Sequence, residues 1–161
     1  MLDIANLTTQ KIDKGFLQKA AVKALEALKQ KNASVSLVLV GVGKIRQLNK
    51  TWRGRNRMTD VLAFAFNKHA FACTPEKKKE SFGFAVPKEA QEFLGEIFIC
   101  LPQAKKQAKE IGHSLKNELT LLLTHGILHL VGYEDEGARR QRDEMEAMQK
   151  RIVDNILEKS A

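Results

Sequence analysis

HGILHLVGYED, residues 125–135, places two histidines four positions apart in a mostly apolar run. Residues four apart on a helix lie one turn above each other, so His125 and His129 can direct two imidazole nitrogens at one point. Gly132 is placed to end that helix in a left-handed cap, after which the chain can turn back and present a side chain from residues 133–135. The stretch therefore predicts a buried helix, a sharp turn and a metal site.

The histidine pair alone does not complete such a site. Catalytic zinc sites keep three protein ligands and leave a fourth position for water, so a third ligand must come from elsewhere. The spacing matches the metzincin protease pattern HExxHxxGxxH except at two places, because Gly126 replaces the glutamate and Asp135 replaces the last histidine. Glycine cannot take a proton, which disfavours a zinc peptidase. The simpler alternative is two histidines that only fill a buried helix with satisfied hydrogen bonds.

The rest of the chain alternates helical and strand patterns. Five segments are predicted to be helices, at residues 15–30, 44–53, 102–112, 114–132 and 138–159. Pro102 is well placed to open the third of them. Short β-branched or aromatic runs predict strands at residues 35–40, 61–66 and 94–101. Residues 67–92 read as a long loop with one short strand at 82–86. We expect a single α+β domain over residues 1–161, with one small mixed sheet, about five helices and the histidine pair on a buried central helix.

The net charge of the chain indicates which kind of partner to expect. The chain has 161 residues, with 27 lysines and arginines against 19 acidic residues, a formal charge of +8 that attracts polyanions. Nucleic acid is the partner to test, although Lys77, Lys78 and Lys79 sit in the expected loop and say nothing about a site.

Other functional classes are excluded by simple patterns. The two cysteines lack CxxC spacing, so they indicate neither a disulfide framework nor a cysteine zinc site. The N-terminus shows no signal-peptide pattern, and we therefore expect the protein in the reducing cytoplasm. No segment is apolar for long enough to predict a membrane span. The GVGK at residues 41–44 lacks the P-loop hydroxyl residue, because Ile45 follows the lysine, so it is read as a glycine turn.

Three motifs together resemble one family. HGILHLVGYED is similar to the HGxLHLxGYDH signature of the YbeY family, bacterial metal-dependent endoribonucleases that act in ribosomal RNA maturation. LNKTWRGRNRMTDVLAF, residues 48–64, resembles that family's LNxxYRxxxxxTDVLSF segment, and LGEIFI, residues 94–99, resembles its LGDIxI strand. The resemblance covers roughly residues 35–135 and preserves the order of the motifs.

The resemblance implies a mixed α/β fold, one zinc ion per chain held by three ligands, and a single-strand-specific endoribonuclease active in ribosome quality control. Single-stranded RNA, ribosomal RNA and the small ribosomal subunit are the implied partners. By position the third ligand is Asp135, where the family has histidine, and zinc accepts an aspartate oxygen beside two histidines. Glu134, Glu136 and His113 are alternative ligands, and Asp135 could instead cap the last helix or pair with Arg139.

Arg53 is the arginine that the resemblance places in the cleft. Its planar guanidinium suits two phosphate oxygens, and its attraction strengthens as charge develops in the transition state, while a zinc-bound water supplies the nucleophile or base. Weaker RNA contacts are predicted for Arg55, Arg57, Lys105 and Lys106. Trp52 is expected in the core, and Thr59 and Asp60 are expected to fix the loop to the following strand.

Two classes of function remain open. The first is a hydrolytic metalloenzyme that cleaves single-stranded RNA. The second is a basic RNA-binding or ribosome-assembly factor whose metal site is weak or structural. A structural zinc usually has four protein ligands, and the sequence offers fewer, which favours an open catalytic position.

Overall fold

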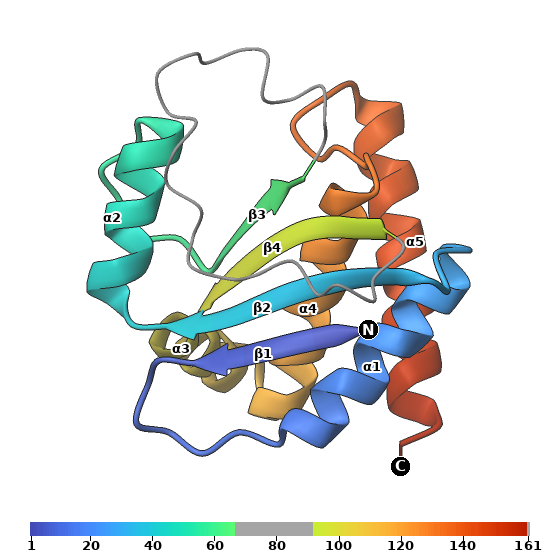
Figure 1. Ribbon diagram of the computed structural model, residues 1–161, viewed down its shortest axis with the longest axis horizontal. Helices are drawn as coiled ribbons and strands as arrows, with labels where there is room; N and C mark the ends of the chain where they lie inside the picture. Colours follow the sequence, from blue (N-terminus) through green and yellow to red (C-terminus); the bar gives the residue numbers. More distant parts are fainter. Residues whose placement is uncertain (67–91, 161) are drawn as a thin grey trace.

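A computed structural model describes residues 1–66 and 92–160, and within them the predicted α+β architecture is confirmed (Figure 1). In the described part of the chain, one sheet contains four strands, and five helices pack around it. The strand expected at residues 82–86 lies outside the described residues. Among the described helices, none combines the length and apolar character needed to cross a membrane.

The sheet has the order β1-β2-β4-β3, with β1 (Leu2–Asn6), β2 (Ala33–Val40) and β4 (Glu92–Cys100) parallel. The edge strand β3 (Val61–Ala65) runs antiparallel to β4. β1 is not predicted by the sequence patterns, because it is short and contains Asp3 and Asn6, residues that are depleted in strands.

Helices cover both faces of the sheet. On one face, α1 (Lys14–Ala27), α3 (Leu101–Ile111), α4 (Leu115–Leu130) and α5 (Arg139–Glu158) enclose the main core. On the other face, α2 (Val42–Arg53) covers a smaller cluster. Every residue of β2 is buried, as is typical of a strand inside a mainly parallel sheet.

α4 is the central helix that carries the histidine pair, as predicted. It begins after Ser114, whose hydroxyl accepts a hydrogen bond from the backbone N–H of Asn117 (3.1 Å). It ends at Leu130 with Val131 as the C-cap, and Gly132 follows with φ of +102°, the left-handed conformation that the sequence predicts. The chain therefore reverses direction directly after the two histidines.

The loop before β3 is held as expected. One carboxylate oxygen of Asp60 accepts a hydrogen bond from the N–H of Val61 (2.8 Å), and the other accepts from the amide of Gln107 (3.2 Å). Trp52 packs edge-on against Phe64, with ring centroids 6.3 Å apart, at the side of the smaller core cluster. The predicted role of Asp60 is confirmed, because it holds the start of β3 to α3. Trp52 is half-buried against the smaller core cluster, where it joins the end of α2 to β3.

Candidate metal centre and cleft

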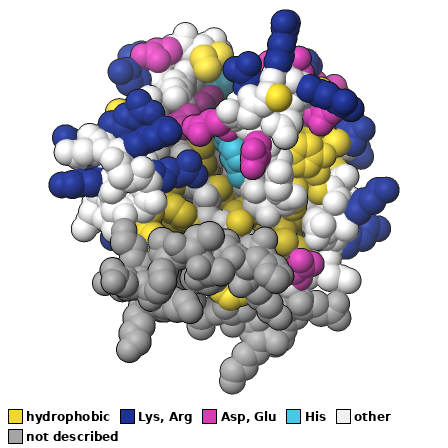
Figure 2. Space-filling view, turned by 90° about the horizontal axis from the view of Figure 1, so that it is seen from above, with side chains coloured by type: hydrophobic (Ala, Val, Ile, Leu, Met, Phe, Trp, Pro, Cys, Tyr) yellow, Lys and Arg dark blue, Asp and Glu magenta, His cyan; other side chains and the backbone are white. Residues whose placement is uncertain are grey.

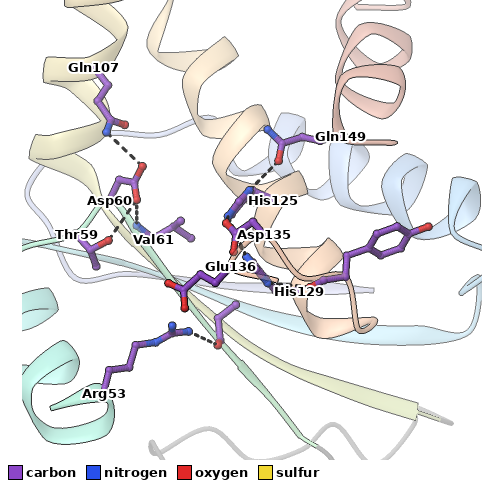
Figure 3. Close-up of polar contacts among 12 residues, drawn as sticks. Arg53, Thr59, Asp60, Val61, Gln107, His125, His129, Asp135, Glu136 and Gln149 are labelled. Atoms are coloured by element: carbon purple, nitrogen blue, oxygen red, sulfur yellow. Dashed lines mark hydrogen bonds and ion pairs between the residues drawn. The ribbon is translucent and has the colours of Figure 1, made fainter. Parts of the chain in front are cut away.

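The imidazoles of His125 and His129 meet on one face of α4. Their Nε2 atoms lie 3.1 Å apart, and their rings are half-buried. The turn after Gly132 brings Asp135 over them, so that its Oδ2 lies 3.3 Å from Nε2 of His125 and 3.5 Å from Nε2 of His129 (Figure 3). All three atoms lie within 4.8 Å of one another, which is compatible with binding to one ion.

Both rings are hydrogen-bonded on the side that faces away from this point. Nδ1 of His129 lies 3.0 Å from the backbone carbonyl of Tyr133, and Nδ1 of His125 lies 2.8 Å from Oε1 of Gln149. A carbonyl oxygen can only accept, so each Nδ1 is the donor, and in the neutral form of each ring Nε2 then keeps a lone pair. Two imidazole lone pairs and a carboxylate therefore converge, and this donor set fits a divalent cation.

The environment also favours the neutral imidazole that a metal requires. Burial lowers the pKa of His129 from its ordinary value, and the neighbouring His125 lowers it further, although Asp135 and the Tyr133 carbonyl act in the opposite direction. Because metal competes with protons for the same nitrogen, a lowered pKa leaves His129 available as a ligand near neutral pH.

The three residues line a cleft of about 610 Å³ at the outer edge of β3. Figure 2 shows the hollow, with histidine in cyan, acidic side chains at its rim and basic side chains beyond them. Its walls come from the end of α2, the loop that follows, β3, α4 and the loop after Gly132. The charged residues that line it are Arg53, Arg55, Arg57, Asp60, Glu134, Asp135 and Glu136.

The structure places three of the predicted RNA-contacting residues on this cleft. Arg53 is exposed at the end of α2, and its Nη2 donates a long hydrogen bond to the carbonyl of Ala63 (3.5 Å). Arg55 forms an exposed ion pair across the cleft with Glu136 (3.6 Å), and Arg57 lies on the wall beside it. Most of the donors of the Arg53 guanidinium are therefore available to a phosphate.

Lys105 and Lys106 are not brought to the cleft. Both are exposed on α3, where Lys106 lies 3.9 Å from Glu110. The alternative ligand His113 is also elsewhere, because its Nε2 lies 2.5 Å from the buried carboxylate of Glu118. Glu134 and Glu136 line the cleft but are not among the three side chains whose donor atoms converge.

The alternative reading of Asp135 as a helix cap does not agree with the geometry. α5 begins after Ala138, whose N–H donates to Oε1 of Gln141 (3.0 Å), and Arg139 lies 3.9 Å from Asp143. Asp135 instead faces the two histidines.

Gln149 is a residue of the site that the sequence analysis missed. It lies on α5 between Met145 and Ile152, within the apolar stripe that faces the core. A polar side chain on such a stripe needs a partner, and this was the available signal. The partner, His125, is 24 positions away in the sequence, and only the packing of α5 on α4 identifies it.

The chain is similar to known proteins over most of its length. The model of the family described as endoribonuclease YbeY matches residues 3–157, so the similarity extends beyond residues 35–135 at both ends. The Persephonella marina protein named endoribonuclease YbeY is 36% identical over 93% of this chain and 88% of its own length. The Moorella thermoacetica protein of the same name is 42% identical over 77% of this chain and 73% of its own length. The solution structure of TM1509 from Thermotoga maritima is 27% identical, with a TM-score of 0.60 over 99% of this chain and 91% of that chain.

Proposed function

This chain belongs to the YbeY endoribonuclease family, and on that premise we propose that it is a zinc-dependent endoribonuclease that cleaves single-stranded RNA. Its substrate is ribosomal RNA, on which it acts in the cytoplasm. Its role is the maturation and quality control of ribosomes, and its partner is the small ribosomal subunit. The observation that carries the proposal is the convergence of His125, His129 and Asp135 in a cleft whose opposite wall carries Arg53.

Each part of the cleft has a role in phosphodiester cleavage. His125, His129 and Asp135 would hold one zinc ion, which when bound would lower the pKa of water so that it could serve as nucleophile or base. Arg53 binds the non-bridging phosphate oxygens and stabilises the charge that accumulates on them in the transition state. Arg55 and Arg57 attract the RNA phosphates on either side of the cleavage site, and their contribution to RNA affinity decreases as the salt concentration rises.

A peptidase is poorly supported by the same residues. Position 126, which carries the catalytic glutamate in the zinc proteases, is glycine here and supplies no general base. A hydrolytic nuclease does not need that glutamate if the metal itself activates water. The arginines of the cleft also suit a phosphate ester better than a peptide bond.

Cleavage of a labelled single-stranded RNA tests the proposal. The purified chain is stripped of metal, its cleavage rate is measured with and without added zinc, and the double variant His125→Ala/His129→Ala is treated in parallel. We expect zinc-dependent cleavage and about one zinc per chain in the wild type, with both lost in a folded double variant. Cleavage without zinc, or full zinc content in the double variant, would overturn the proposal, and RNA binding without cleavage would identify an assembly factor.

A further inference from the structure

We propose that Gln149 is a positioning residue that fixes the tautomer and the orientation of the His125 ring, an inference that rests on the proposed metal site. Its Oε1 lies 2.8 Å from Nδ1 of His125, on the side of the ring opposite to Asp135 (Figure 3). Gln149 is not among the residues that line the cleft. It therefore acts on the reaction only through His125.

The two histidines differ in how their tautomers are fixed. His129 donates to the backbone carbonyl of Tyr133, an acceptor that no side-chain substitution removes. His125 depends on a side chain, and that side chain comes from another helix. Without the oxygen of Gln149, a neutral His125 can carry its proton on Nε2, where it excludes a metal.

The packing of α5 makes Gln149 a rigid partner. Met145 lies one turn before it and Ile152 one turn after it, and both are buried in the core between α4 and α5. The amide thus has a defined direction even though the residue itself is only half-buried. In this way the C-terminal helix, which contributes no ligand among the described residues, contributes to the metal site.

The chemical type of Gln149 also matters, because an amide is neutral. With Asp135 as the one carboxylate among the three ligands, an amide partner adds no second negative charge near the ion. Glutamate at position 149 would keep the acceptor oxygen and add a charge, whereas leucine would keep the approximate size and remove the acceptor. These two substitutions therefore separate hydrogen bonding from packing.

The test measures the ring tautomers in the metal-free protein by ¹⁵N NMR and the zinc affinity by competition with a chromophoric chelator. Glu146→Leu, an exposed position on the same helix, is the matched control. In Gln149→Leu we expect His125 to gain the Nε2–H tautomer and zinc to bind about 10- to 100-fold more weakly. His129 should keep its tautomer in every variant, and Gln149→Glu should preserve both the His125 tautomer and zinc binding.

An unchanged His125 tautomer in a folded Gln149→Leu would overturn the positioning role, as would a zinc affinity reduced equally by Glu146→Leu. The tautomer is read without metal, so it tests Gln149 even if the proposed zinc site fails. Absence of zinc binding in the wild type, with the tautomer still controlled by residue 149, would reject the proposed function and retain the positioning role of Gln149.

Discussion

Gly126 packs directly against the side chain of Ile97, where α4 crosses β4. A Cβ atom at position 126 would lie 2.8 Å from both Cδ1 and Cγ2 of Ile97, closer than side chains in a packed core approach each other. Glycine is therefore needed for the close contact between helix and sheet. The same contact explains why the position beside His125 has no side chain that could act as a base.

We expect Gly126→Ala to lower the free energy of unfolding by about 1–3 kcal/mol, because the methyl group must displace Ile97 or lift α4 from the sheet. Gly43→Ala is the control, since nothing lies within 4 Å of a Cβ atom there and the residue is helical. That control should be neutral or slightly stabilising. Chemical denaturation measures both, and equal effects of the two substitutions would contradict the packing explanation.

The local features of the site could be predicted from the sequence. His125 and His129 share a helix face by spacing alone, and Gly132 is typical of a helix end that needs positive φ. The edge of the sheet at β1 could not be predicted, because Leu2–Asn6 has little strand character and is stabilised by pairing with β2. Local sequence patterns do not report such pairing.

The hydrogen bond that supports the candidate metal site from α5 could not be predicted from the sequence either. Gln149 contacts His125 only because α5 packs on α4, and its spacing along the chain gives no sign of that contact. Lys105 and Lys106 are predicted RNA contacts that do not line the cleft, and their contact with RNA stays a prediction. A charge pattern does not say which side of the fold a helix faces, and both lysines are exposed on α3 outside the residues that line the cleft.

Arg53→Ala should lower the cleavage rate much more than it lowers RNA affinity. We expect a loss of about 10²–10³ in kcat, since the guanidinium acts mainly on charge that develops in the transition state. Single-turnover kinetics and RNA binding are measured on the same preparation. Arg46→Ala, an arginine on α2 that is bonded to Asn56 and lies outside the cleft lining, is the control. Equal losses of affinity and rate in Arg53→Ala would assign it to binding alone.

Zinc should increase RNA affinity at the cleft as well as cleavage. The cleft is lined by three arginines and four carboxylates, so its formal charge is −1 with neutral histidines and becomes +1 when one divalent ion binds. We expect zinc to tighten binding of a short RNA by about tenfold at low salt. Stopped-flow binding, before cleavage proceeds, measures this effect. The double histidine variant should show none, and an equal effect there would mean that zinc acts elsewhere.

Glu96 should make the stability of the fold depend on pH. Burial raises the pKa of its carboxyl to about 7 from its ordinary value of 4.5. The protonated Glu96 carboxyl therefore gives its full stability below pH 4.5, where it is protonated in both the folded and the unfolded protein. That stability is lost as the pH rises through 7, because the buried carboxyl must then ionise or stay protonated at a cost. Glu96→Gln should stabilise the protein by about 1–3 kcal/mol at pH 8 and by little at pH 4.5. Glu92→Gln, at an exposed position of β4, is the control for denaturation at both pH values. A gain that is the same at both would exclude ionisation as its cause.

If Asp135 is the third metal ligand, loss of its side chain should lower zinc affinity more than it lowers the stability of the metal-free protein. Asp135→Ala leaves two imidazoles as ligands. We therefore expect its zinc affinity to fall by at least the roughly 10- to 100-fold that is typical when an outer hydrogen-bond partner of a ligand is removed, so that a chelator removes the zinc more readily. Asp135→His supplies a nitrogen ligand instead and should retain zinc at least as well as the wild type. Zinc retention and the melting temperature of the metal-free protein are compared for both variants. Glu136→Ala, which removes a neighbouring carboxylate that faces Arg55, should leave zinc retention unchanged. If Asp135→Ala kept its zinc while its metal-free form melted lower, Asp135 would have only a structural role.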